Sequence, residues 1–227
     1  VQFGLIVRDS LIADISKSEA FESDNDANGS SLTPKTSAVF SNITAFGPLT
    51  TPDNIGNSNY LGAAVQIRRN SSLSIFNSAF VGWKTGILID AGLGRPTDLN
   101  IADGNLQLSG VLLISCKNQV GYTASTTAAT GATQASMESW FTSNTKNKII
   151  AANAVQNTYT RPFDYLLPDF APFGNSAVVI PSATNTYFDD PIIAARPFIK
   201  KVDFIGAVAP AGEDANWFKG WTQLGTK

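Results

Sequence analysis

The residue types best suited to chemistry in this sequence lie in one acidic stretch near its start. Residues 21–31 read FESDNDANGSS, in which Asp24, Asp26 and Asn28 alternate ahead of a glycine. Calcium takes about six to eight oxygen ligands, and alternating Asp and Asn side chains in a tight turn supply several of them. Glu22 lies close enough in the sequence to add another carboxylate. The candidate metal ligands are therefore Glu22, Asp24, Asp26 and Asn28, with calcium as the cation.

A second interpretation of this stretch stays open. A helix–loop–helix calcium site needs a bidentate Glu at the last position of its loop, where this sequence has Lys35. The flanking residues also resemble strand and loop, so a helix–loop–helix site is excluded. A loop site completed by a neighbouring part of the chain remains, and so does a solvated corner in which Asp and Asn bond to their own backbone.

Paired acids beside aromatic residues could also cleave a carbohydrate. Asp189 and Asp190 follow Tyr187-Phe188 and precede a proline. A glycosidase needs one acid to protonate the leaving oxygen and another to attack or to activate water. Adjacent residues of an extended segment point to opposite faces, so the second acid would have to come from elsewhere. The candidates for that partner are Asp164, Asp169 and Asp203, and the alternative is an acidic turn before the proline.

The basic doublets and the tryptophans allow two interpretations each. Arg68-Arg69 and Lys200-Lys201 could supply the proton-abstracting base of a β-helix polysaccharide lyase beside a calcium ion, or they could form surface salt bridges. Four tryptophans could stack on sugar rings if they were exposed in a row. Alternatively, the two near the end of the chain form a hydrophobic plug. These tryptophans are Trp83, Trp140, Trp217 and Trp221.

The composition excludes several classes of function. The chain has 227 residues and no His, which removes Ser-His-Asp catalysis, zinc hydrolysis and imidazole base chemistry. Its lone Cys116 lies in an apolar run and is expected to be a buried, inert thiol. A net charge of −2 without a basic run argues against nucleic acid as a partner. No apolar run reaches the about 20 residues that a membrane span needs, so none is expected in this piece. We assign no catalytic residue.

Short apolar segments recur along the first half of the chain. Residues 3–10, 40–47, 75–82 and 108–115 can be aligned, and their starts are 37, 35 and 33 residues apart. This spacing falls within the about 20–45 residues of one solenoid repeat. Further strand candidates lie between them, and Asn, Ser and Gly occupy the expected corners. The pattern predicts an all-β fold, a right-handed parallel β-helix of about four coils, whereas a β-sandwich would space its strands more evenly.

Three regions of one structural domain follow from the composition. Residues 1–121 are predicted to form the coils. Residues 122–152 contain a low-complexity excursion over 122–136 and a short helical turn over 137–141. Residues 153–227 are rich in proline and aromatic residues, which argues against long regular elements. We expect them to form the last coil and an irregular aromatic cap that closes the C-terminal end.

Several of these segments together resemble a known family. They are the starting VQFGLIVRD, the FESDN stretch, RRNSSLSIFNSAFVGW at 68–83, GILID at 86–90 and the ending DFIGA…WFKGW. They are similar to the C-terminal half of a family of secreted or surface-anchored β-helix proteins of Bacteroidetes. The resemblance implies export to the outer-membrane surface or beyond. It also implies that the chain is a piece of a longer protein and stacks on upstream coils, and it implies no activity.

Two functional hypotheses remain. The first is a non-enzymatic secreted or cell-surface module that binds polysaccharide or cell-surface glycan, or serves as an adhesin-like spacer. The flat sheets of a β-helix present ladders of Asn, Ser and Thr that suit an extended glycan. The alternative is a carbohydrate-active enzyme, either a polysaccharide lyase or a glycoside hydrolase, that uses carboxylates and calcium. A cluster of two or three acids with an Arg or Lys on one sheet face would distinguish the enzyme from the binding module.

Overall fold

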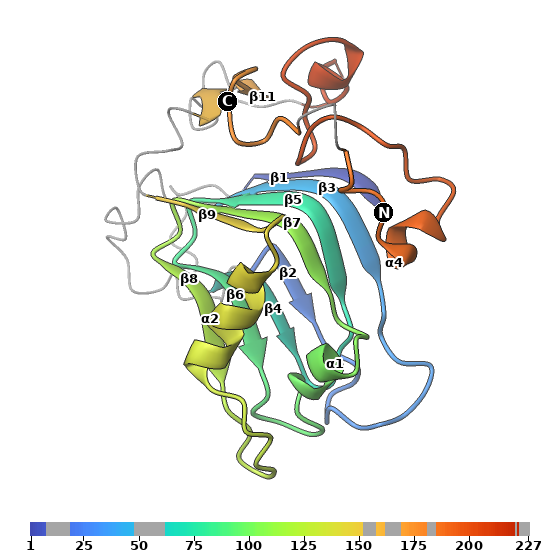
Figure 1. The fold of residues 1–227 in the computed structure, drawn as a ribbon, viewed down its shortest axis with the longest axis vertical. Helices are drawn as coiled ribbons and strands as arrows, with labels where there is room; N and C mark the ends of the chain where they lie inside the picture. The colour runs from blue at the N-terminus through green and yellow to red at the C-terminus, as the bar shows by residue number, and fades with distance from the viewer. Residues whose placement is uncertain are drawn as a thin grey trace.

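Two parallel β-sheets wind around a common interior (Figure 1). The computed structural model describes residues 1–7, 19–47, 62–151, 158–161, 169–180, 185–220 and 222. One sheet has the order β1-β3-β5-β7-β9 and comprises β1 (Gln2–Val7), β3 (Val39–Phe46), β5 (Ser74–Val81), β7 (Leu108–Ile114) and β9 (Lys148–Ile150). The other has the order β2-β4-β6-β8 and comprises β2 (Phe21–Ser23), β4 (Ala63–Arg68), β6 (Thr85–Asp90) and β8 (Asn118–Thr123).

Successive strands along the chain belong to the two sheets alternately, so each coil adds one strand to each sheet. All the pairings within these sheets are parallel. This connectivity is that of a β-solenoid of about four coils, so the predicted parallel β-helix is confirmed.

The register of the five-stranded sheet follows the predicted repeats in two of three coils. Phe40 pairs with Ile75, and Ile75 pairs with Leu108, which are the spacings of 35 and 33 residues expected from the sequence. In the first coil Gln2 pairs with Ser41, a spacing of 39 rather than 37 residues. Because side chains alternate with a period of two, this shift leaves the same faces buried.

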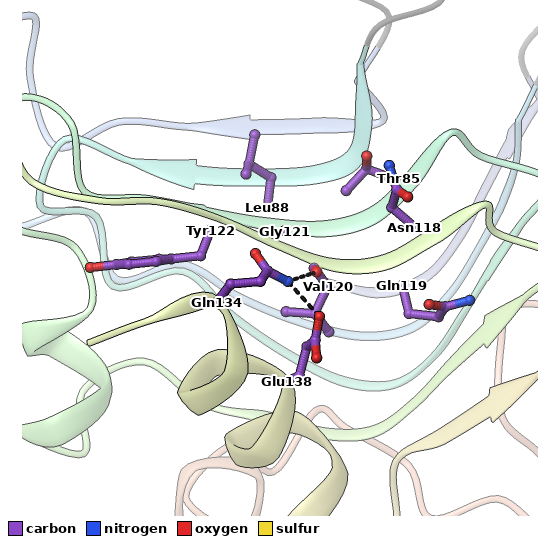
Figure 2. Close-up of a pocket in the computed structure, with 9 residues that line it drawn as sticks. All are labelled: Thr85, Leu88, Asn118, Gln119, Val120, Gly121, Tyr122, Gln134 and Glu138. Atoms are coloured by element: carbon purple, nitrogen blue, oxygen red, sulfur yellow. Dashed lines mark hydrogen bonds between the residues drawn. The ribbon is translucent and has the colours of Figure 1, made fainter. Parts of the chain in front are cut away.

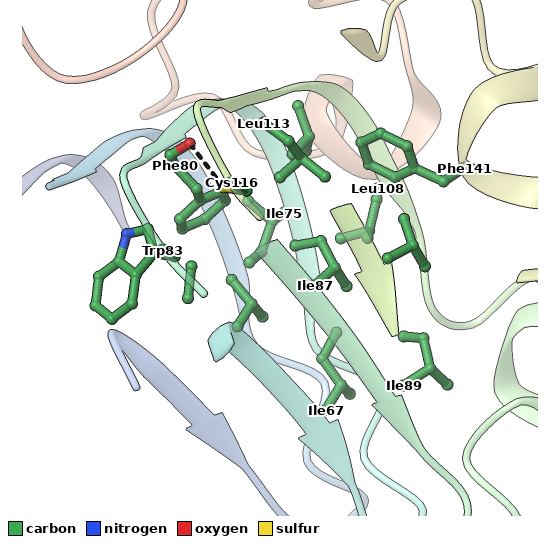
Figure 3. Close-up of a cluster of buried hydrophobic side chains, with 14 of the residues drawn as sticks. Ile67, Ile75, Phe80, Trp83, Ile87, Ile89, Leu108, Leu113, Cys116 and Phe141 are labelled. Carbon is green, nitrogen blue, oxygen red and sulfur yellow. Dashed lines mark hydrogen bonds between the residues drawn. The ribbon is translucent and has the colours of Figure 1, made fainter. Parts of the chain in front are cut away.

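Apolar side chains from both sheets fill the interior (Figure 3). Residues at equivalent positions of successive coils stack on one another, as Ile67 does on Ile89 and Phe80 on Leu113. Trp83 is fully buried, and its Nε1 donates to the carbonyl of Ala45 at 3.1 Å. The stacked apolar side chains of successive coils thus form one continuous interior core.

The C-terminal region covers the outer face of the five-stranded sheet. It contains the antiparallel pair β10 (Tyr159–Arg161) and β11 (Asp169–Pro172), the short helix α4 (Pro191–Ala194) and the 3₁₀-helix η2 (Glu213–Ala215). Its aromatic and aliphatic side chains form a second core with the outward residues of β3, β5 and β7. This double coverage explains why β5 is buried along its whole length. The region is irregular and aromatic, as predicted, and after β9 its described residues add no strand to either solenoid sheet.

A helix covers the end of the interior at the last coil. Helix α2 (Gln134–Ser143) places Met137 and Phe141 in the interior core, with exposed fractions of 7% and 1%. The helical turn predicted at 137–141 is confirmed, and a capping box between Thr133 and Ser136 starts the helix. Closure of the end, which we expected from the C-terminal region, is thus provided by α2. Figure 1 shows α2 beside β8, β9 and β7.

The strands of the five-stranded sheet bend at residues with left-handed backbone. Asn42, Asn77 and Gly110 stack at successive coils with φ values of 55°, 48° and 71°. Asn and Gly tolerate this conformation best. The Nδ2 atoms of the two asparagines donate to the carbonyls of Phe204 and Tyr187 in the C-terminal region. The bends therefore also anchor that region to the sheet.

Candidate functional site

The carboxylates of the predicted calcium loop lie beside two arginines. Asp24 Oδ1 lies 2.7 Å from Arg68 Nε, and Asp24 Oδ2 lies 2.9 Å from Arg69 Nη1. Glu22 pairs in register with Gln66 of β4, two residues before Arg68, and also contacts the Arg68 guanidinium. Two of the four predicted calcium ligands, Glu22 and Asp24, are therefore already paired with arginine side chains. The salt-bridge interpretation of the Arg68-Arg69 doublet is confirmed.

Asp26 holds the corner of this loop by bonding to its own backbone. Its Oδ1 accepts from the amide of Asn28 at 2.8 Å, and its Oδ2 accepts from the hydroxyl of Ser30 at 2.5 Å. The Ser30 hydroxyl and these backbone amides lower the pKa of Asp26 below its ordinary value. Lys35, at the last loop position, donates to Asn100 Oδ1 at 2.8 Å.

Calcium binding by these residues stays a prediction. Within the described ranges, no group of three or more His, Cys, Asp or Glu side chains is arranged to hold a metal ion. The four candidates Glu22, Asp24, Asp26 and Asn28 do share one loop and its adjoining strand. Their oxygens are engaged by arginines or by the loop itself, apart from the exposed Asn28.

The acidic pair near α4 is split between two roles. Asp189 forms an ion pair with Lys201 at 2.7 Å, whereas Asp190 caps α4 by accepting from the amide of Ile192 at 2.8 Å. This confirms the interpretation as an acidic turn before Pro191. Of the proposed partner acids, Asp169 caps its own turn by accepting from Ala171, and Asp164 lies outside the described residues.

The three tryptophans that the structure describes do not form an exposed row. Trp83 belongs to the interior, and Trp217 packs in the C-terminal core with its Nε1 donating to the Ala207 carbonyl at 2.7 Å. Trp140 is half-buried on α2. Trp221 lies outside the part of the chain that the structure describes.

A polar groove runs between the outer face of β8 and α2, and we call it the β8 groove (Figure 2). It consists of two hollows of about 350 and about 430 Å³, which share Gln119, Val120 and Glu138 in their walls. Val120 belongs to the interior core, so the pleat directs its neighbour Gln119 outward. The other polar side chains of the groove are Thr85, Asn118, Tyr122, Gln134, Ser139 and Thr142.

Hydrogen bonds fix the middle of the groove. Gln134 Nε2 donates to the Val120 carbonyl at 2.6 Å and to Glu138 Oε1 at 2.7 Å, as Figure 2 shows. The Tyr122 hydroxyl donates to Asp98 Oδ1 at 3.3 Å. Burial, with the nearby Asp98 charge, raises the pKa of Tyr122, so this hydroxyl is protonated at neutral pH. The walls are thus neutral except at Glu138.

Sequence reasoning did not identify the β8 groove. Gln119 and Asn118 lie on a strand that the repeat pattern did not single out, and Gln134 lies in the low-complexity excursion. The available signal was the outward position of Gln119, which strand alternation predicts. The fold of residues 122–136, which brings α2 alongside β8, had no signal in the sequence.

Comparisons of the chain with protein-family models, curated proteins and solved structures found no significant match. Within the described ranges, no helix has both the length and the apolar character needed to cross a bilayer.

Proposed function

We propose that this chain is a non-enzymatic glycan-binding module and that the β8 groove holds a neutral polysaccharide. The observation that supports this most is the continuity of the two hollows, which share the wall formed by Gln119, Val120 and Glu138. A continuous groove suits several linked sugar units better than a single small molecule.

The chemistry of the walls favours a neutral ligand. Amide and hydroxyl side chains both donate and accept hydrogen bonds, as sugar hydroxyls do. Among the described residues, the walls include no Lys or Arg, and their one charged side chain is the Glu138 carboxylate. Like charges repel, so an acidic polysaccharide would bind less well.

The composition of the groove also favours binding over cleavage. Glycoside hydrolysis uses a pair of carboxyl groups about 5–9.5 Å apart across the scissile bond. Of the lining residues that the structure describes, Glu138 is the single acid in the β8 groove. A lone carboxylate can accept hydrogen bonds from sugar hydroxyls without supplying both roles of a hydrolase.

A module of this kind would act outside the cell. We include in the proposal the location that the resemblance to the Bacteroidetes family implies, secretion or display on the outer-membrane surface. The amide-rich groove, with Glu138 as its charged side chain, is compatible with an adhesin-like spacer that carries a glycan site.

Affinity electrophoresis in gels that contain one soluble polysaccharide each tests the proposal. The panel comprises mannan, mixed-linkage β-glucan, xylan and starch as neutral polymers, with polygalacturonate and heparin as acidic ones. We expect retardation by at least one neutral polymer. Gln119→Ala and Asn118→Ala should each weaken it severalfold, since both remove amide groups from the wall.

Asn216→Ala serves as the matched control, because Asn216 is an exposed amide outside the groove. It should migrate like the unmodified chain in every gel. Retardation by the acidic polymers alone, or by none of the six, contradicts the proposal. Equal loss of retardation in the control and groove variants would also contradict it.

A further inference from the structure

A second pocket lies on the opposite side of α2 from the β8 groove. It is bounded by α1 (Leu99–Ala102), the start of β7, the C-terminal half of α2 and the residue that caps α4. We call it the Trp140 pocket. Its volume is about 360 Å³, and its apolar walls come from Ile101, Leu106, Leu108 and Trp140.

Within the described part of the chain, Asp190 is the single charged side chain in the walls of the Trp140 pocket. One of its oxygens accepts from the Ile192 amide, and the carboxylate is half-buried. No Lys or Arg of the described residues forms an ion pair with it, whereas its neighbour Asp189 is paired with Lys201. Asp190 therefore presents to the pocket a carboxylate that no cation of the described residues pairs with.

Two further groups suit a cation. Trp140 lines the same pocket, and the face of an indole attracts cations within about 6 Å of the ring centre. Gln107 donates its Nε2 to the Gly104 carbonyl at 3.3 Å, which leaves its amide oxygen as an acceptor. A primary ammonium has three N–H groups, and a carboxylate with an amide oxygen can satisfy most of them.

We propose that the Trp140 pocket binds a small organic ammonium, namely a primary amine attached to an apolar ring or chain. The ammonium contacts Asp190 and Gln107, and the apolar body lies against Trp140 and the adjoining aliphatic walls. The pocket shares no lining residue with the β8 groove, so this proposal is independent of the glycan proposal.

The test compares cyclohexylammonium with cyclohexanol, its neutral analogue of similar shape. Each is titrated at pH 7 into the ¹⁵N-labelled chain while the indole N–H signal of Trp140 is followed, with Trp140→Phe to identify that signal. We expect a saturable shift for cyclohexylammonium, with an affinity about tenfold above that for cyclohexanol, because the carboxylate and the indole both favour the cation.

Asp190→Asn removes the charge and keeps an N-cap residue, because Asn caps helices about as well as Asp. It should abolish the preference for the ammonium and leave the affinity for cyclohexanol unchanged. Asp189→Asn removes a neighbouring charge outside the pocket and should retain the preference. Equal affinity of the unmodified chain for both probes, the absence of a saturable shift, or equal effects of the two variants would overturn the proposal.

Discussion

At the scale of single side chains, the residues around Asp24 fit two opposing interpretations, a calcium site and a salt bridge. The spacing of its loop matches the start of a calcium site, and its carboxylate nevertheless lies between two arginines. A sequence pattern specifies which oxygens are near one another along the chain. It does not specify which cationic side chain the fold places beside them. Here that side chain is Arg68, 44 residues further along the chain, which donates to Asp24.

Calcium should therefore leave the chain's melting temperature unchanged. A ligand that binds only the folded state raises the melting temperature by mass action, and here calcium would have to displace Arg68 and Arg69 from Asp24. Differential scanning calorimetry with millimolar calcium or with chelator measures this directly. A rise that disappears in a variant with Asp24→Asn and Asp26→Asn would instead establish the predicted metal site.

Cys116 should resist alkylation in the folded chain. Burial raises the pKa of its thiol to about 12, so the reactive thiolate is scarce at pH 8. Only the unfolded chain ionises near the ordinary value of 9.0, so the folded state loses stability as the pH rises from there toward about 12. Iodoacetamide labelling followed by mass spectrometry should show modification in denaturant and none in buffer at pH 8. Labelling of the folded chain that increases between pH 7 and 9 would contradict this.

At the scale of elements, α2 determines whether the interior is closed. Replacing Phe141 with Ala should lower the free energy of unfolding by about 3–5 kcal/mol, the usual cost of removing a buried aromatic ring. Ser139→Ala, on the exposed side of the same helix, is the control and should change it little. Chemical denaturation followed by circular dichroism measures both. Similar stabilities for the two variants would mean that α2 does not close the core.

A single methyl group at Gly206 should weaken the packing of the C-terminal region against β3 and so destabilise the chain. This glycine has a φ of 90°, and a Cβ there would lie 2.4 Å from Thr44 Oγ1 of β3. That hydroxyl also accepts from the Ala207 amide at 2.8 Å. We expect Gly206→Ala to cost about 1–3 kcal/mol, as strained backbone commonly does. Gly174→Ala, which meets no atom within 4 Å, should be neutral, and equal melting temperatures would refute the close contact.

At the scale of the whole molecule, the repeats made the solenoid predictable, because stacked coils repeat the same apolar positions at nearly constant spacing. The further strands expected between the repeats and the helical turn at 137–141 were predictable for similar local reasons. The positions of α2 and of the C-terminal region depend on contacts between distant residues, such as Asn42 with Phe204. Irregular segments lack periodicity, so the β8 groove and the Trp140 pocket could not be located beforehand.

Chemical-shift mapping tests most directly whether the β8 groove binds the proposed glycan. The ¹⁵N-labelled chain is titrated in turn with hexasaccharides of mannan, β-glucan, xylan and starch. We expect saturable chemical-shift changes with at least one of them. The changes should be grouped over Asn118–Tyr122 and Gln134–Thr142, whose side chains line the groove. Shifts grouped instead at the Asp24 loop or the Trp140 pocket, or no saturable shift with any of the four, would contradict it.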